Sequence, residues 1–265
     1  MKISIITPSL NQGKFIEETI KSVVSQQGDF ELEYIIIDGQ SIDNSIEIID
    51  KYAKKYPFIK WVSEKDDGQA QAINKGFKMA SGDIINWLCA DDLLLPGCLQ
   101  KVCSFFGKNK DARVVFGHGE FIDESGNVFR YFKSREFSRP ELIKRWSCVN
   151  QKFNLSQPSV FVKKEILGDI GFIDENNRFC MDYEWHLRIN KKYNFYFIGG
   201  LLSQSRYHKD CKSVKFRDEQ YKESILASKK FWNENYFYYA SSYLCYLPYI
   251  FAGKIFRKLR ILFFQ

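Results

Sequence analysis

The stretch IINWLCADD, residues 84–92, decides the fold of this chain, because an apolar run ends directly on two acidic side chains, Asp91 and Asp92. A second apolar run, YIII at residues 34–37, ends in the same way on Asp38. Continuous apolar runs of this length are typical of strands that are buried on both faces of a sheet. Both segments therefore predict buried strands that place carboxylates at their carboxyl ends.

Helical patterns alternate with the apolar runs over the first half of the chain. Asn11 is predicted to cap the first helix, Asn44 or Ser45 begins the second, and the third covers residues 69–79. This alternation predicts an α/β fold with a parallel sheet and helices on both of its faces. The predicted strands are residues 3–7, 34–37, 59–62 and 84–88.

The ends of these predicted strands carry the first functional indication. Ligands of such sheets bind in the crevice beyond the carboxyl ends of the strands. The polar residues that fall at those ends are Thr7, Asp38, residues 64–67, Asp91 and Asp92.

The second half of the chain has a less regular pattern. Residues 99–106 and 182–193 are predicted helices, and residues 114–116 form a predicted strand. Residues 120–122 and 128–132 flank a turn-forming segment, so they predict a β-hairpin.

The composition excludes several classes of protein. Of the 265 residues, 45% are apolar, which is enough for a sizeable core and argues against disorder. The seven cysteines include no CxxC pair, which argues against a structural zinc site and a disulfide framework. The N-terminus lacks the features of a signal peptide. We therefore expect a folded protein in the cytoplasm, where thiols stay reduced.

The acidic pair indicates a metal site. The adjacent carboxylates of Asp91 and Asp92 lie among apolar residues and would repel each other unless a cation were bound there. Oxygen ligands suit Mg²⁺ or Mn²⁺, and such an ion can neutralise a diphosphate leaving group. A solvated turn or a helix cap is the simpler interpretation of the same pair.

Five other polar residues suit nucleotide or acid–base chemistry. Asp38 could accept hydrogen bonds from a base or ribose, although Asp-Gly also forms turns. Lys75 could reach a phosphate from its helix. Asp182 and Glu184 lie two residues apart on a helix, so only one of them should face a pocket. That carboxylate could act as a general base. The alternative is that the two residues only cap the helix and match its dipole. His208 could complete a metal shell or contact a diphosphate.

Taken together, five segments in this order resemble the family 2 glycosyltransferases, which have the GT-A fold. The resemblance implies a Rossmann-like α/β fold with a mixed, mainly parallel central sheet flanked by helices. The resemblance extends over about the first four-fifths of the chain. It implies an inverting transfer from a nucleoside-diphosphate sugar, with UDP as the expected nucleotide. The segments are IITPSLN at 5–11, IIDGQSID at 36–43, DGQAQAINKG at 67–76, WLCADD at 87–92 and DYEWHLR at 182–188.

The resemblance also implies roles for individual residues. Asp92 and His208 would hold Mn²⁺ or Mg²⁺, and Asp182, with Glu184 as its competitor, would be the catalytic base. The Gln-x-x-Arg-Trp motif of processive members is absent, which favours addition of a single sugar. The residues that would contact the nucleotide or sugar are Thr7, Pro8, Asn11, Asp38, Asp67, Gln69, Asn74, Lys75 and Asp91.

The end of the chain differs in composition from the rest. From Asn235 to Gln265 there is no acidic residue, but aromatic and basic residues are frequent. This composition favours contact with a membrane surface, and packing on the catalytic domain or on a second subunit is the alternative. The predicted division is a GT-A domain at 1–212, with a nucleotide-binding half at 1–100 and an acceptor half at 101–212, and a helical, aromatic and basic tail at 213–265.

Together with these features, the resemblance implies a metal-dependent hexosyltransferase of cell-surface polysaccharide synthesis at the inner face of the plasma membrane. The donor would be a nucleoside-diphosphate sugar, and the acceptor a hydroxyl of a glycan or of a lipid-linked molecule. One alternative is a sugar-phosphate nucleotidyltransferase, although residues 8–14 match its basic phosphate loop poorly. The other is an inactive nucleotide-binding scaffold. We do not expect a nucleic-acid partner, because no recognised module appears.

Overall fold

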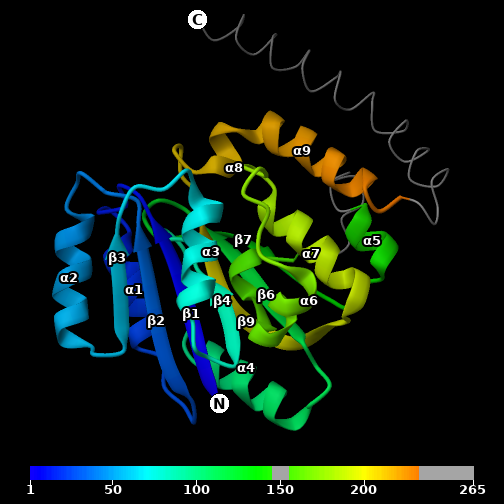
Figure 1. Cartoon of the computed structure of the whole chain (residues 1–265), viewed down its shortest axis with the longest axis horizontal. Coiled ribbons are helices and arrows are strands. Elements are labelled where there is room, and N and C mark those ends of the chain that lie inside the picture. Colours follow the sequence, from blue (N-terminus) through cyan, green and yellow to red (C-terminus); the bar gives the residue numbers. More distant parts are fainter. Residues whose placement is uncertain (145–154, 233–265) are drawn as a thin grey trace, which may run out of the picture.

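The computed structural model describes residues 1–144 and 155–232, and within them nine strands form one sheet (Figure 1). The strand order is β3-β2-β1-β4-β8-β6-β9-β5, and β7 pairs with β6 outside this path. The strands are β1 (Lys2–Ser9), β2 (Glu31–Asp38), β3 (Ile59–Ser63), β4 (Ile84–Trp87), β5 (Leu93–Leu94), β6 (Val114–Ile122), β7 (Val128–Phe132), β8 (Val160–Lys163) and β9 (Phe195–Arg206). The α-helices are α1 (Ile16–Val24), α2 (Ser45–Lys55), α3 (Gln69–Met79), α4 (Cys98–Lys108), α5 (Arg139–Ile143), α6 (Leu167–Ile170), α7 (Met181–Lys192), α8 (Lys212–Lys215) and α9 (Arg217–Lys229).

Strand direction divides the sheet into two regions. β3, β2, β1 and β4 run parallel to one another. β8 is antiparallel to both β4 and β6, and β9 runs parallel to β6. Six of the nine strands in the described residues therefore share one direction, which confirms the predicted mixed, mainly parallel sheet.

Each face of the sheet carries its own hydrophobic core, because successive side chains of a strand point to opposite faces. Ile6 of β1 packs in the core covered by α3 and α7. Ile3 and Ile5 of the same strand pack in the core covered by α1, α2 and α4. Figure 1 shows α3 and α7 in front of the sheet, with α1 behind it.

Close packing fixes α3 and α7 over the first of these cores. A Cβ added at Gly76 of α3 would lie 2.3 Å from Cγ2 of Ile6, so only glycine lets α3 approach β1 this closely. The rings of Phe77, Trp87 and Trp185 have centroids 5.4 to 5.9 Å apart and join α3, β4 and α7. This aromatic cluster sets the position of α7 relative to the end of β4.

Most of the predicted elements are confirmed, with changed ends. The predicted helix at 69–79 matches α3, and residues 120–122 and 128–132 form the predicted hairpin within β6 and β7. β8 and β9 were not predicted. In β9, Gly199 and Gly200 both have positive φ, of 65° and 75°, and they interrupt the regular pattern that would identify a strand.

The prediction that Asn11 caps the first helix is wrong. α1 begins at Ile16, and the preceding residues form a turn in which the Gln12 carbonyl accepts bonds from the N–H groups of Phe15 and Ile16. Asn11 itself has a φ of 52°, and its Oδ1 accepts a hydrogen bond from the Ile42 N–H at 2.9 Å. Its side chain therefore joins two loops instead of capping a helix.

The part of the predicted tail that the structure describes packs on the rest of the chain. Ile225, Ala227 and Trp232 are buried in the core that also contains residues of α7. The remaining tail, residues 233–265, lies outside the described residues, so the domain division stays a prediction. No helix within residues 1–144 and 155–232 is both long and apolar enough to cross a membrane.

A buried carboxylate in β2 joins this strand to β1, to β3 and to the segment before β4. Glu33 of β2 is 3% exposed and accepts hydrogen bonds from Ser4 Oγ at 2.6 Å, Lys60 Nζ at 2.8 Å and the Ser81 N–H at 2.7 Å. Burial by itself would raise the pKa of Glu33, but these bonds outweigh it and lower the pKa to about 2. The ionised carboxylate therefore stabilises the folded chain.

Glu33→Gln should lower the free energy of unfolding by roughly 2–3 kcal/mol at neutral pH, because the bonded carboxylate is lost. A carboxyl with a lowered pKa contributes stability above about pH 4.5 and loses it as the pH falls towards 2. Urea unfolding at pH 7 and pH 3 should show the difference between the two proteins shrinking at the lower pH. An equal difference at both pH values would contradict this account.

Candidate active site

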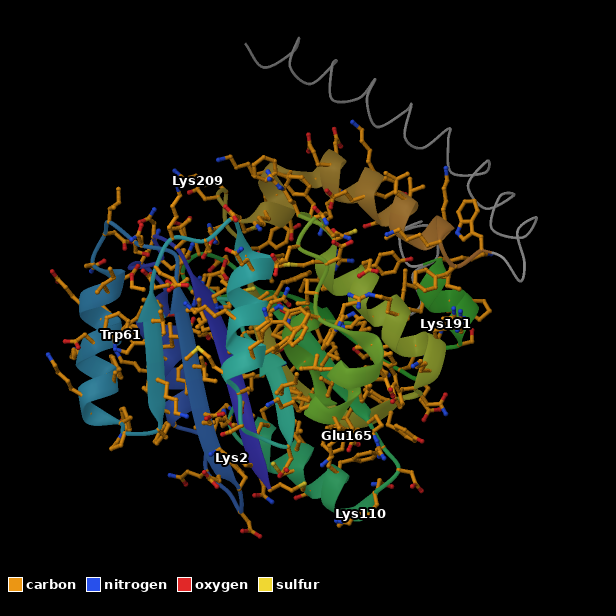
Figure 2. All side chains as sticks on the ribbon, viewed as in Figure 1. Lys2, Trp61, Lys110, Glu165, Lys191 and Lys209 are labelled. Carbon is orange, nitrogen blue, oxygen red and sulfur yellow. The ribbon has the colours of Figure 1, made fainter. Side chains whose placement is uncertain are left out.

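A cleft of about 660 Å³ opens at the carboxyl ends of β1, β4 and β9. Figure 2 shows Lys209, which follows the lining residue His208, at the opposite edge of the molecule from Lys2 and Lys110. The cleft thus lies where the sequence predicted a ligand site. Its polar lining residues are Ser9, Gln12, Asp66, Gln69, Cys89, Asp91, Asp92, Ser156, Gln157, Arg178, Asp182, Ser205, Arg206, Tyr207, His208, Asp210, Cys211, Lys212, Ser213 and Gln220.

The acidic pair lies in the turn between β4 and β5. Thr19 of α1 donates through Oγ1 to the carbonyl oxygens of Ala90 and Asp92, both at 2.9 Å, and this holds the turn against the helix. The Asp92 residue is 7% exposed, and its Oδ1 accepts a hydrogen bond from the Arg206 N–H at 2.9 Å. Asp91 is more exposed and also lines the cleft.

The pair carries negative charge that its surroundings compensate incompletely. Burial raises the pKa of the Asp92 carboxyl well above its usual value, and repulsion from Asp91 raises it further. The backbone N–H and the charge of Arg206 act in the opposite direction without cancelling the increase. A divalent cation would therefore favour the ionised form of Asp92.

Three side chains could hold such an ion. Cys89, Asp91 and Asp92 each place one ligand atom within 4.8 Å of the others. Carboxylate oxygens are the ligands that Mg²⁺ and Mn²⁺ prefer, whereas thiolates select softer metals. Burial raises the pKa of the Cys89 thiol well above its usual value, and the charges of Asp92 and Asp91 add to this. The donor set therefore fits a hard ion bound by carboxylates, beside a protonated thiol.

Arg206 at the end of β9 connects the acidic turn to two other elements. Its side chain is 1% exposed, and its Nε donates to the Asp91 carbonyl at 3.1 Å. Its Nη2 contacts Oε2 of Glu18 in α1 at 2.5 Å. Its Nη1 donates to the carbonyls of Asp123 and Glu124, at 3.3 and 3.2 Å, in the β6–β7 turn. One buried guanidinium thus joins α1, the acidic turn and the hairpin.

His208 lies beside Asp91 of the acidic pair. Its Nε2 lies 3.1 Å from Oδ2 of Asp91, and the centroid of its ring lies 4.8 Å from the centroid of the Phe15 ring. The histidine is therefore placed where it could share a cation or a diphosphate with Asp91.

The two candidate bases on α7 face different surroundings. Asp182 lines the cleft. Glu184 is 4% exposed, and both of its carboxylate oxygens accept hydrogen bonds from Nε of Arg188, at 2.9 and 3.0 Å. Only Asp182 is therefore placed to meet a molecule bound in the cleft.

Asp38 does not line the cleft, but it organises the loop after β2. It is fully buried and accepts hydrogen bonds from the Ser41 N–H at 2.9 Å, from Ser41 Oγ and from Ser63 Oγ at 2.8 Å. Ser41 Oγ in turn accepts from the Asn11 N–H at 2.8 Å. These bonds join the loops that follow β1, β2 and β3.

Several residues with an implied nucleotide contact lie outside the cleft lining. Asn74 is buried and bonds Ile173 and Glu175, and Lys75 pairs with Glu64. The implied residues that line the cleft are Pro8, Gln69, Asp91, Asp92, Asp182 and His208. Those that do not are Thr7, Asn11, Asp38, Asp67, Asn74, Lys75 and Glu184.

The model of glycosyl transferase family 2 matches residues 4–171, which is more than half of the chain. The chain belongs to this family.

Relatives of this family 2 member come from bacteria and archaea. An uncharacterized glycosyltransferase of Methanocaldococcus jannaschii is 29% identical over 207 residues, which cover 77% of this chain and 70% of that protein. The minor teichoic acid biosynthesis protein GgaB of Bacillus subtilis is 29% identical over 210 residues, 77% of this chain and 22% of GgaB. The GalNAc(5)-diNAcBac-PP-undecaprenol beta-1,3-glucosyltransferase of Campylobacter jejuni is 30% identical over 177 residues, 66% of this chain and 55% of that enzyme. The chain thus spans less than two thirds of the last two relatives.

Solved structures show that this family 2 member has the GT-A fold. The 1–349 fragment of S. aureus TarS, in complex with UDP-GlcNAc, superposes with a TM-score of 0.65 at 20% identity, covering 80% of this chain and 60% of the fragment. GalNAc-T7 with UDP, GalNAc and Mn²⁺ gives a TM-score of 0.61 at 15% identity, covering 78% of this chain and 44% of that one. The predicted fold class is thereby confirmed.

The cleft of this family 2 member also contains residues that the sequence did not indicate. Arg178 and Lys212 add positive charge to the lining. Burial lowers the pKa of Lys212, although Cys89 and Asp66 oppose this shift. Because Arg178 lies in a loop and Lys212 begins the four-residue helix α8, no periodic pattern in the sequence could have placed them together. Asp66 lines the cleft in place of its predicted neighbour Asp67.

Asp92→Asn should raise the melting temperature of the metal-free family 2 member by a few degrees, because it removes a buried repulsion while an amide Oδ1 still accepts the Arg206 N–H. The same change should abolish any stabilisation by Mn²⁺. Thermal unfolding with and without Mn²⁺ measures both effects. The exposed Asp29→Asn is the matched control and should behave like the wild type. A full Mn²⁺ shift in Asp92→Asn would remove Asp92 as a ligand.

Proposed function

We propose that this protein transfers a sugar from a nucleoside-diphosphate donor, with UDP as the nucleotide, to a hydroxyl of a glycan or lipid-linked acceptor. One observation carries the proposal. A single cleft holds the acidic pair, which follows β4 and includes the buried Asp92, and a separate carboxylate, Asp182, at the start of α7. Nucleotide-sugar transfer needs both of these, one for the departing diphosphate and one for the acceptor proton.

The comparisons support the proposed class of reaction. GgaB is named for teichoic acid biosynthesis, and the Campylobacter jejuni relative is named as a glucosyltransferase on an undecaprenol-linked glycan. TarS was solved with UDP-GlcNAc. We therefore place this protein in cell-surface polysaccharide synthesis. Family membership favours a glycosyltransferase over the nucleotidyltransferase alternative.

The acidic pair is the proposed site of Mn²⁺ or Mg²⁺. Asp92 would bind the ion. Asp91 lies beside Asp92 and His208 lies beside Asp91, so both could contact the ion, the ribose or the diphosphate. Such an ion would neutralise the charge of the leaving diphosphate. Arg178 and Lys212 line the same cleft and would add positive charge to the site of the diphosphate.

The donor would lie between the first strand ends and α3. Pro8 and Gln69 line this side of the cleft, and Gln69 Nε2 donates to Cys89 Sγ at 3.2 Å next to the acidic pair. Asp38 and Asn11 would contribute indirectly, because their hydrogen bonds to Ser41 order the loops that would contact the base and ribose. Direct nucleotide contacts by Thr7, Asp67, Asn74 and Lys75 remain predictions.

The proposed chemistry is one in-line displacement, which inverts the anomeric carbon. The acceptor hydroxyl oxygen forms a bond to that carbon while the bond to the diphosphate oxygen breaks. Asp182 takes the hydroxyl proton as attack begins, and the diphosphate leaves with the electron pair. General-base assistance of this kind typically contributes about 10²–10⁴ in rate.

The reaction is proposed to take place in the cytoplasm at the inner face of the plasma membrane. The five cysteines in the described residues are free, as expected in a reducing compartment. Peripheral membrane contact by the aromatic and basic part of the tail stays a prediction, because residues 233–265 lie outside the described residues.

Asp182→Asn should lower kcat by about 10²-fold or more while the Kd for the donor stays nearly unchanged, because the amide cannot accept the proton. Donors are first screened among UDP-, GDP- and dTDP-sugars with Mn²⁺, by thermal stabilisation and by donor hydrolysis. Calorimetry and turnover of the best donor then test the variant.

Glu184→Gln is the matched comparison on the same helix. It should lower the melting temperature, because Arg188 loses its buried partner, but keep the kcat of the folded protein. The reverse pattern, with full turnover in Asp182→Asn and none in Glu184→Gln, would make Glu184 the base. Donor binding without any turnover of the wild type would favour the inactive scaffold.

A further inference from the structure

Three aromatic rings pack together at the end of the β6–β7 hairpin. Phe121 of β6 and Phe129 of β7 are nearly parallel, with centroids 6.1 Å apart and an angle of 16°. Tyr207, which follows β9, lies 5.2 Å from Phe121 and 6.2 Å from Phe129. We call Phe121, Phe129 and Tyr207 the aromatic platform.

Much of the aromatic platform is exposed to solvent. Phe129 is 55% exposed and Tyr207 is 38% exposed. The neighbouring Val128 adds another exposed apolar side chain. Exposed apolar groups that are contiguous mark binding surfaces more often than single ones do. Aromatic rings held in place before binding lose little conformational entropy when a ligand covers them.

The aromatic platform continues directly into the cleft. Phe121 and Tyr207 are lining residues of the cleft, together with the acidic pair and Asp182. Tyr207 lies between Arg206 and His208 in the chain, and its N–H donates to the Ile122 carbonyl at 2.8 Å. A ligand bound on the platform would therefore lie at the cleft and could extend into it.

The hairpin that carries Phe129 is held rigidly. Asp123 Oδ1 accepts hydrogen bonds from the N–H groups of Ser125 and Asn127, both at 2.9 Å, and Gly126 has a φ of 88°. The Arg206 side chain donates to two carbonyls of the same turn. The platform thus keeps a fixed position relative to the acidic pair.

The surroundings of the aromatic platform are polar. Ser205 lies opposite Phe121 in the β6–β9 ladder, and its Oγ is 3.5 Å from the Oγ of Ser156, with both serines lining the cleft. The exposed Arg130 is paired with Phe121 in the β6–β7 ladder. A lipid tail would require an enclosed apolar groove, whereas a sugar ring offers an apolar C–H face to aromatic rings and hydroxyls to polar neighbours.

We propose that the aromatic platform binds a sugar ring of the acceptor, so that this enzyme recognises its acceptor as a saccharide. The inference rests on the proposed function and extends it by naming the chemical class of the acceptor and the surface that binds it. Phe129 is a binding residue of this surface that is exposed and lies outside the cleft lining.

Phe129→Ala tests the platform without touching the cleft lining. The full-length protein, without donor, is applied to an array of immobilised short free oligosaccharides, and the best-bound oligosaccharide then serves as the soluble acceptor in kinetics. The variant should bind the array about tenfold more weakly, the loss expected for one aromatic stack. In turnover the acceptor KM should rise by a similar factor, while the donor KM and donor hydrolysis stay at wild-type values.

Phe172→Ala is the matched control. Phe172 is also an exposed aromatic residue, 38% exposed, but it lines a separate hollow with Lys110 and Glu165. Figure 2 shows Lys110 and Glu165 toward the edge opposite Lys209. This control should match the wild type in array binding and in acceptor KM.

Three results would overturn the inference. The first is a wild-type protein that binds no oligosaccharide on the array. The second is equal binding by wild type and Phe129→Ala. The third is Phe129-dependent binding only to phosphatidylglycerol vesicles that carry a polyprenyl phosphate. Failure of the proposed function is distinguished separately, because it would appear as a wild type that turns over no nucleotide sugar, whatever the array shows.

Discussion

The cleft depends on the burial of one guanidinium, that of Arg206. A buried charge is tolerated only when its donors are satisfied, and here Glu18 and three backbone carbonyls accept from the side chain. These acceptors come from α1, from the turn after β4 and from the β6–β7 turn. Loss of any one would leave a buried donor without a partner, so the three elements are held at fixed distances around the acidic pair. The same residue uses its backbone N–H to orient Asp92.

A second group of contacts holds the helix with the proposed base against the donor side. Asn74 of α3 bonds the backbone of Ile173 and the side chain of Glu175, in the segment that leads to α7. The Trp87 and Trp185 rings, with centroids 5.4 Å apart, also pack α7 against β4. These contacts fix α7 so that Asp182, at its start, lines the same cleft as the acidic pair. Asn74, for which the resemblance implies a nucleotide contact, instead lies where it positions α7.

The accuracy of sequence-based prediction followed the regularity of the pattern. The strands of the first half were predictable, because strands buried on both faces leave continuous apolar runs such as residues 34–37. β9 was not, because its side chains are mostly half-buried and Gly199 and Gly200 break the pattern. In the site, the acidic pair was visible as a local motif. Arg206, Arg178 and Lys212 were not, because their meaning comes from partners distant in the chain.

The sequence by itself determined the alternating strands and helices, the cleft edge and the family, because these follow from local periodicity and from short motifs. Only the tertiary structure showed that Asp182 lines the cleft while Glu184 is buried against Arg188, since two residues on one helix turn differ in what packs against them and not in propensity. It also decided that Asp38, Asn74 and Lys75 lie outside the cleft lining, and that Phe121, Phe129 and Tyr207 form one surface. The physical reason is that burial, ion pairing and ring contacts are properties of neighbours brought together by folding, which no single segment encodes.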